Sequence, residues 1–224
     1  MKPITREDFF FVLDDNYDEH VERSIPLYAE MHSEMLNFVT TGSRVLDLGC
    51  GTGKTALNIL EHRPESSVFG IDLFQEMLDR ARDKARHWGN RINFAQGDFR
   101  TVPLGGPYDV CVTALSLHHL LPEEKRDLYR RVWAALVPNG KFLIVDWTKF
   151  GNPTVQSAAA RWAEQHVAQH ARNEQVAGAW IDHWRNKNIP ETVDDMISSL
   201  RHAGFSATEC VIKYMNLAFL WASK

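Results

Sequence analysis

The sequence has few cysteines, no excess of positive charge and no long apolar run. Its three cysteines among 224 residues are an odd number without a Cys-x-x-Cys pair, which argues against a disulfide framework and a cysteine-based zinc site. The net charge of −4 lacks the basic excess that is typical of nucleic-acid-binding proteins. No run of about 18 apolar residues and no signal-peptide pattern is present. We therefore expect a cytoplasmic protein whose partner is neither a membrane nor a nucleic acid.

Short β-type runs alternate with helical patterns over the middle of the chain, which predicts βαβ units and a parallel sheet. The expected strands span residues 44–48, 68–71, 92–95, 108–114 and 142–145, with a last pair inside 206–223. The expected helices span residues 22–39, where Pro26 breaks the helix, and 54–62, 74–88, 123–136, 154–186 and 191–203. Together they predict an α/β fold, a Rossmann-like, doubly wound, mostly parallel seven-stranded sheet with a C-terminal antiparallel hairpin and helical lid segments.

The most informative stretch is Asp47-Leu48-Gly49-Cys50-Gly51-Thr52-Gly53-Lys54-Thr55, which follows the first expected strand and opens a helix. Such a loop lets the backbone approach a ligand at the helix N-terminus. A dinucleotide fingerprint requires a glycine at the position of Lys54, so NAD is disfavoured. A Walker A loop requires its first glycine at the position of Leu48, and Gly49 is one residue too near. A nucleoside triphosphate is therefore the weaker alternative.

A third candidate ligand follows from a resemblance. The loop resembles the first motif of the class I S-adenosylmethionine-dependent methyltransferases, acidic-x-Gly-x-Gly-x-Gly, which Asp47, Gly49, Gly51 and Gly53 match in full. In this family an acid after the second strand accepts the ribose hydroxyls, and the segment after the third strand binds the adenine amino group and stacks on its ring. The corresponding matches are Asp72 after the second strand, Gly97-Asp98-Phe99 after the third, residues 114–120 after the fourth, and residues 136–141 at the turn before the fifth.

The resemblance implies a methyltransferase that uses S-adenosyl-L-methionine. We expect no bound metal. The cofactor-binding residues that it implies are Tyr28, Asp47, Gly49, Cys50, Gly51, Gly53, Asp72, Leu73, Asp98, Phe99 and Ala114. His166 and His170 have the i, i+4 spacing that suits a metal. Zinc normally needs three or four protein ligands, however, and the pattern offers no third.

Within this class the whole chain is similar to carboxy-S-adenosylmethionine synthase and the methyltransferases related to it. The shared pieces are residues 23–28 and 200–205, and the resemblance implies a homodimer. The synthase holds its cofactor's extra carboxylate with an arginine at the position of Ser199 and uses an asparagine at the position of Ala114. Both departures favour plain methyl transfer to a small-molecule acceptor. The alternatives are the synthase or a related enzyme of tRNA wobble-uridine modification, and a non-catalytic module, against which the intact loop argues.

Methyl transfer from a sulfonium is an in-line displacement, so the protein mainly aligns the reacting atoms, and it needs a general base only for a nucleophile that keeps its proton at pH 7. Ligands of open α/β sheets lie beyond the carboxyl ends of the strands. The catalytic candidates are therefore His118 and His119 after the fourth strand and Asp146 after the fifth. Adjacent residues point in different directions, so we expect only one of the two histidines to face the cleft. A structural role is the alternative for each candidate.

A single sheet implies a single methyltransferase domain over residues 1–224. Its expected parts are an N-terminal helical cap (1–40), a cofactor-binding core (41–150), a helical lid (151–190), and the last helix with the terminal hairpin (191–224). Lids of this kind exclude water from the reaction. The lid residues that we expect to line an acceptor pocket, unless they only pack on the core, are Arg161, Trp162, Trp180 and Trp184.

Overall fold

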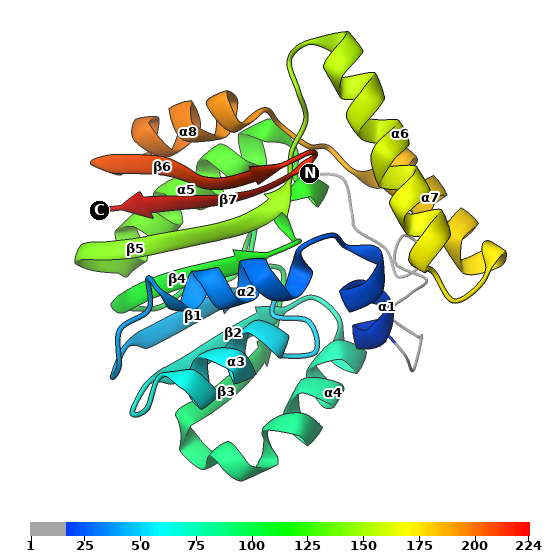
Figure 1. The fold of residues 1–224 in the computed structure, drawn as a ribbon. Coiled ribbons are helices and arrows are strands. Elements are labelled where there is room, and N and C mark those ends of the chain that lie inside the picture. The colour runs from blue at the N-terminus through cyan, green and yellow to red at the C-terminus, as the bar shows by residue number, and fades with distance from the viewer. Residues whose placement is uncertain (1–16) are drawn as a thin grey trace.

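A seven-stranded sheet forms the centre of the molecule (Figure 1). The computed structural model describes residues 17–224, so the first sixteen residues of the expected cap lie outside the description. The strands follow the order β3-β2-β1-β4-β5-β7-β6, and only β7 runs antiparallel to its neighbours on both sides. Their bounds are β1 Arg44–Leu48, β2 Ser67–Asp72, β3 Ile92–Gln96, β4 Tyr108–Ala114, β5 Leu136–Trp147, β6 Ala207–Tyr214 and β7 Leu217–Ser223. The predicted Rossmann-like sheet with its antiparallel hairpin is thus confirmed.

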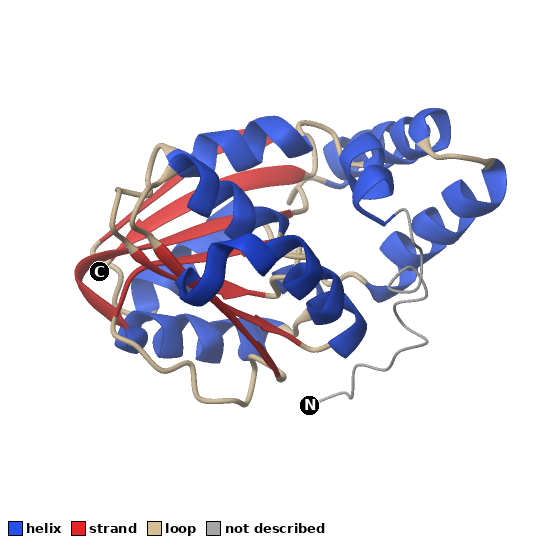
Figure 2. Ribbon diagram, turned by 90° about the horizontal axis from the view of Figure 1, so that it is seen from below, coloured by secondary structure: helices blue, strands red, loops and turns tan. Residues whose placement is uncertain are grey.

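Helices cover both faces of this sheet, and a further helical pair lies beyond one end of it (Figure 2). One face carries α2 and α3, the other carries α5 and α8, and α6 with α7 forms the outlying pair (Figure 1). The helix bounds are α1 Tyr17–Ser24, α2 Tyr28–Leu36, α3 Lys54–His62, α4 Gln75–Ala85, α5 Pro122–Ala135, α6 Pro153–His170, α7 Glu174–Lys187 and α8 Val193–His202. Among the described residues, no helix is both long and apolar enough to cross a bilayer.

Alternation along the strands divides the core into two layers. In β1, Leu46 and Leu48 pack with α5 and α8, whereas Val45 packs with α2 and α3 on the opposite face. Successive side chains of a strand point to opposite faces, so a strand buried on both sides needs apolar residues throughout. Full burial of one such side chain contributes about 1.5–3 kcal/mol. The sheet is therefore a rigid platform, and its strand ends hold the loops in place.

Several expected element bounds were wrong, each for a local reason. The helix predicted over 74–88 ends at Ala85, and a 3₁₀ segment follows in which Gly89 has a left-handed φ of 56°. The fifth strand, predicted over 142–145, spans residues 136–147 because Tyr108 of β4 already pairs with Leu136. The helix predicted over 154–186 is two helices, since Asn173 caps a second one by accepting a hydrogen bond from the Val176 N–H (2.9 Å).

Candidate active site

A cleft opens where β1, β2, β3 and β4 end, between the glycine loop and the outlying helices. The cofactor candidates that line it are Tyr28, Gly49, Cys50, Gly51, Asp72, Leu73, Asp98, Phe99 and Ala114. Both catalytic histidine candidates, His118 and His119, line the same cleft. Parallel strands bring all of these loops to one edge of the sheet, as expected for a ligand site of this fold.

The glycine loop and Asp72 hold each other in position. The Asp72 carboxylate accepts hydrogen bonds from the Gly51 N–H (2.8 Å) and the Phe74 N–H (2.9 Å). Gly49 has φ 70°, and a Cβ there would lie 2.1 Å from the Ser116 hydroxyl oxygen, so only glycine fits. Burial raises the pKa of Asp72, although both N–H bonds oppose this shift. The loop therefore places a carboxylate, which only accepts hydrogen bonds when ionised, at the end of β2.

Lys54 and Thr55, the residues that imitate a Walker A ending, are engaged within the protein. The Lys54 ammonium forms an ion pair with Glu22 of α1 (2.5 Å). The Thr55 hydroxyl lies 3.1 Å from Nε2 of His32, whose Nδ1–H donates to the Tyr28 carbonyl (2.8 Å). These contacts fasten the start of α3 to α1 and α2. Both side chains are thus engaged within the protein and neither is directed to a phosphate, which agrees with the nucleoside triphosphate being the weaker alternative.

Asp47 lies behind the loop instead of in the cleft. Its side chain is 1% exposed, and its carboxylate accepts a hydrogen bond from the Ala56 N–H in the first turn of α3. Within residues 17–224, its Oδ2 atom has no hydrogen-bond partner. The described lining of the cleft includes neither Asp47 nor Gly53, so the prediction that they contact the cofactor lacks support. Side chains alternate between the two faces of β1, so Asp47 points toward α3 and supports the glycine loop from outside the cleft.

The Asp47→Asn variant is expected to gain stability relative to the cofactor-free wild type as the pH rises. Burial, with Asp72 as the second cause, raises the pKa of Asp47 from 3.8 to about 7. The folded state therefore keeps a proton that the unfolded chain releases near pH 3.8, and the stability from this carboxyl falls as the pH rises toward about 7. Asparagine does not titrate. Urea unfolding at about pH 5 and about pH 8 measures the difference. An equal difference at both pH values would contradict the assignment, and exposed Asp79→Asn is the control.

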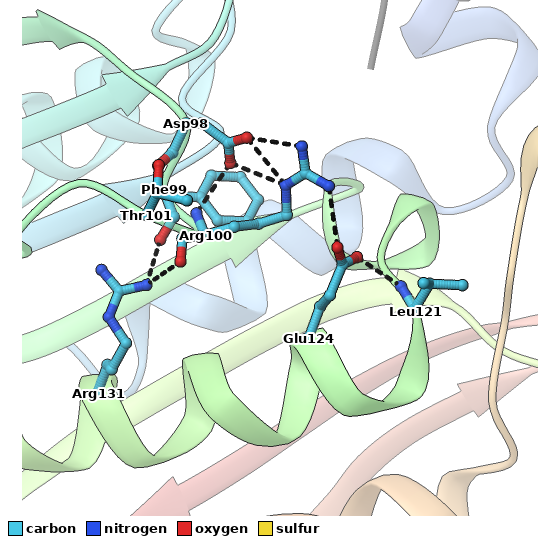
Figure 3. A network of polar contacts seen from close by, with 7 residues as sticks. All are labelled: Asp98, Phe99, Arg100, Thr101, Leu121, Glu124 and Arg131. Atoms are coloured by element: carbon cyan, nitrogen blue, oxygen red, sulfur yellow. Dashed lines mark hydrogen bonds and ion pairs between the residues drawn. The ribbon is translucent and has the colours of Figure 1, made fainter. Parts of the chain in front are cut away.

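Asp98 and Phe99 lie beside the loop, at the end of β3, and Asp98 is already paired. Figure 3 shows the Arg100 guanidinium between the carboxylates of Asp98 and Glu124. The Asp98 carboxylate keeps 23% exposure and lines the cleft, whereas the Arg100 side chain is 6% exposed. Sequence reasoning missed Arg100 because nothing in the local pattern distinguishes it from a solvated arginine.

His118, which lines the cleft, forms a buried pair with Asp146, which lies behind it. The His118 Nδ1–H donates to the Asp146 carboxylate, which also accepts from the main-chain N–H groups of Leu117 (2.6 Å), His118 (3.2 Å) and Trp147 (2.6 Å). Asp146 is 1% exposed and His118 is 5% exposed. The carboxylate fixes the tautomer of the imidazole, so Nε2 is the nitrogen that can accept a proton. The structure thus brings His118 and Asp146, from the loop after β4 and from the end of β5, into direct contact.

The expectation that only one of the adjacent histidines faces the cleft was wrong. His118 and His119 both line it, with ring centroids 3.9 Å apart, in a 3₁₀ turn over residues 117–119. The His119 ring also meets His183 of α7 edge-on, at 5.5 Å. Burial, and then the neighbouring His118, hold the pKa of His119 well below 6.5, so its imidazole is neutral at pH 7.

Helix α7 contributes aromatic side chains to the cleft, but only two of the four predicted lid residues are among the residues that line it. Trp180 and Trp184 line the cleft, whereas Trp162 packs edge-on against Tyr214 of β6 at 5.1 Å. Arg161 is likewise absent from the described lining. His183 was missed, although Trp180, His183 and Trp184 have the i, i+3, i+4 spacing of residues on one side of a helix.

The segment after α7 is fastened beside His118. The Ile189 N–H donates to the His118 carbonyl (2.5 Å), and the Lys125 ammonium of α5 donates to the Ile189 carbonyl (2.7 Å). Lys125 is 2% exposed and forms an ion pair with Glu191 (3.2 Å). Leaving either charge without its partner would be costly in so buried a place. The segment after α7 is therefore tied to the loop that carries the candidate base.

The charges of the cleft suit S-adenosylmethionine better than a phosphate compound. Asp72 and Asp98 present carboxylates, which accept hydrogen bonds from hydroxyl and amino groups and repel phosphates. The cationic lining residues in the described chain, Lys54 and Arg100, are paired with Glu22 and with Asp98 and Glu124. A Cβ on Gly51 would meet nothing within 4 Å, so the loop leaves room next to its backbone. These residues fit a cationic nucleoside with a ribose and an amino group.

Comparisons with known proteins agree with S-adenosylmethionine as the ligand of this cleft. A family model described as a methyltransferase domain matches residues 45–140. The carboxy-S-adenosyl-L-methionine synthase of Nautilia profundicola is 25% identical over 228 residues, covering 100% of this chain and 97% of that protein. An O-methyltransferase family protein from Burkholderia thailandensis has a similar fold (TM-score 0.70, 18% identity, 96% of this chain and 61% of that chain).

Human N-acetylserotonin methyltransferase, solved in complex with S-adenosylmethionine, also has a similar fold (TM-score 0.60, 18% identity, 99% of this chain and 60% of that chain). At these identities the solved structures speak for the fold alone. The domain match covers β1 to the turn in β5, which includes the glycine loop, Asp72, Asp98 and His118. These findings support a class I S-adenosylmethionine-dependent methyltransferase, an enzyme with S-adenosylmethionine as its cofactor.

Proposed function

We propose that the enzyme transfers a methyl group to a small-molecule acceptor held between the strand ends and α7, with His118 as general base. The observation that carries this proposal is the His118–Asp146 pair, which borders the cleft shared with the cofactor loop. When bound, S-adenosylmethionine supplies a methyl group already activated on its sulfonium. The protein's task is then to align the acceptor, exclude water and remove one proton.

The contacts of His118 suit it to that task. Nδ1–H is directed to Asp146, so Nε2 accepts the proton of an acceptor hydroxyl or N–H group as the new bond to carbon forms. Asp146 is in turn held by the three main-chain N–H groups described above, and its negative charge stabilises the imidazolium that results. Trp180 and Trp184 of α7 also line the cleft and keep water away from the reacting atoms.

Carboxy-S-adenosylmethionine synthesis is the second candidate, because curated relatives with that name match 96–100% of the chain. Capture of an extra carboxylate would need a cation that is not already paired. Lys54 and Arg100 are engaged with carboxylates of the protein, Ala114 is apolar, and Ser199 on α8 does not line the cleft in the described chain. These features support methyl transfer over the synthase reaction.

Two incubations followed by mass spectrometry test the proposal. Protein with S-adenosylmethionine and a panel of small phenols, amines and thiols is expected to yield S-adenosylhomocysteine and one methylated acceptor. Protein with S-adenosylmethionine and prephenate is expected to leave the cofactor mass unchanged. A cofactor heavier by a carboxylate group would overturn the proposal in favour of the synthase.

A further inference from the structure

Arg100 lies between two functional parts of the enzyme. Its guanidinium donates to both Asp98 oxygens, from Nε at 2.9 Å to each and from NH2 at 2.6 Å to Oδ2. Its remaining arm, NH1, donates to Oε1 of Glu124 at 3.0 Å. Asp98 follows β3, whereas Glu124 lies in the first turn of α5, so one buried side chain joins two separate segments (Figure 3).

The strand order indicates which part of the cofactor reaches Asp98. The glycine loop follows β1, Asp72 ends β2 and Asp98 follows β3, and these strands are neighbours in that sequence. A nucleoside whose ribose lies at Asp72 therefore extends its base toward Asp98 and Phe99. The 6-amino group of adenine is a donor, and a carboxylate is an acceptor. The Asp98 carboxylate also accepts from the main-chain N–H of Arg100 (2.9 Å, to Oδ1). Arg100 thus directs three N–H hydrogens to a carboxylate with four acceptor sites, which leaves one site for the base.

Arg100 keeps Asp98 charged and in one orientation. Burial raises the pKa of Asp98, but the hydrogen bonds from Arg100 outweigh this effect and hold the pKa below its ordinary value. The flat guanidinium fixes the plane of the carboxylate by contacting both oxygens, as a single ammonium cannot. Arg131 holds the same segment by its backbone, donating to the carbonyls of Phe99 (2.8 Å) and Arg100 (2.6 Å).

Glu124 anchors the other side of the network. Its Oε2 accepts from the Leu121 N–H (2.9 Å) at the start of α5, while Oε1 holds Arg100. The Glu124 side chain is 9% exposed, which makes both contacts well shielded from water. Leu121 follows the 3₁₀ turn with His118, so the same glutamate caps the loop of the candidate base.

We propose that Arg100, held by Glu124, is a positioning residue that sets the preference of the enzyme for a 6-aminopurine cofactor by orienting Asp98. The inference rests on the cofactor placement proposed above. A base with an oxygen in place of the amino group turns an acceptor toward Asp98 and is repelled. Without Arg100, the Asp98 carboxylate reorients, and the enzyme distinguishes less well between a purine with an amino group and one with an oxygen at the same position.

The test measures two ligands on each variant by titration calorimetry: S-adenosylhomocysteine and S-inosylhomocysteine, in which an oxo group replaces the amino group. We expect wild type to prefer the adenosyl compound, and Arg100→Met to lower the ratio of the two affinities about tenfold or more, since a charge-assisted hydrogen bond is at stake. Arg100→Lys is expected to restore part of the ratio, and Glu124→Gln to lower it less than Arg100→Met. Arg130→Met is the matched control, because Arg130 forms an exposed pair with Asp127 on the same helix.

The outcomes separate this inference from the proposed function. A wild type without preference, or an unchanged ratio in Arg100→Met, overturns the role of Arg100. Equal weakening of both ligands also overturns it, because a merely structural role predicts that result. If Arg100→Met does not fold, Arg100→Lys and Glu124→Gln decide the matter by the same ratio. Failure to find a methylated acceptor would sink the proposed function and leave this ratio unaffected.

Discussion

His118→Gln is expected to lower kcat for methyl transfer by about 10²–10⁴-fold, the usual contribution of a general base, with little change in the affinity for S-adenosylhomocysteine. Glutamine retains a polar side chain of similar reach but accepts no proton at neutral pH. His118 donates through Nδ1 to a carboxylate that is 1% exposed, so its second nitrogen is the atom that the reaction would use. The measurement is the rate of S-adenosylhomocysteine formation with the acceptor that the screen identifies.

Two further variants make this result specific. Asp146→Asn is expected to lower kcat in the same direction, because an amide stabilises an imidazolium less than a carboxylate does. His202→Gln on α8 should retain wild-type kcat, since the His202 ring donates to the Ser198 carbonyl of its own helix, at the surface. An unchanged kcat in His118→Gln would show that the acceptor loses its proton without this residue. Loss of cofactor binding in His118→Gln would point to a structural role for the histidine.

The parts of the site that sequence predicted well are those that topology alone determines. Asp72, Asp98 and His118 follow three strands that run parallel, so their loops had to meet at one edge of the sheet. The glycine loop could be located for the same reason, because a strand, a run of glycines and a helix leave few alternatives. These positions needed only the order of elements, and that order is visible in hydrophobic periodicity.

Asp47 shows where a motif conflicts with local geometry. The motif groups it with the cofactor-binding glycines, yet β1 alternates, and Asp47 points to the side of α3 that Val45 also faces. The period of two along a strand could have revealed this from the sequence. The two lid helices were also within reach, since Asn152-Pro153 and Asn173 are start signals for helices.

Ion pairs between distant segments could not be predicted. Arg100 with Glu124, and Lys125 with Glu191, join residues 24 and 66 positions apart by difference of residue number. Whether two such side chains meet depends on the relative placement of helices and on the rotamers, neither of which periodicity encodes. The Lys125–Glu191 pair and the contacts of Arg100 with Asp98 and Glu124 could therefore be found only in the folded structure.

Asp72→Ala is expected to weaken S-adenosylhomocysteine binding by about 10²–10³-fold, because two charge-assisted hydrogen bonds to the ribose would be lost. Titration calorimetry on the variant and on wild type measures the loss. Asp79→Asn is the matched control, since Asp79 is an exposed carboxylate on α4 paired with Arg82. An unchanged affinity in Asp72→Ala would contradict the placement of the ribose at the end of β2.

A second ligand decides how Asp72 acts, because its carboxylate also accepts from the Gly51 N–H and could support binding through the loop alone. An S-adenosylhomocysteine analogue without both ribose hydroxyl groups completes a double-mutant cycle. If the carboxylate binds the ribose, the analogue should bind wild type weakly and lose little further affinity in Asp72→Ala. If Asp72 only shapes the loop, both ligands should lose affinity by the same factor. The cycle thus separates direct contact between the Asp72 carboxylate and the ribose from an indirect effect of Asp72 on the shape of the glycine loop.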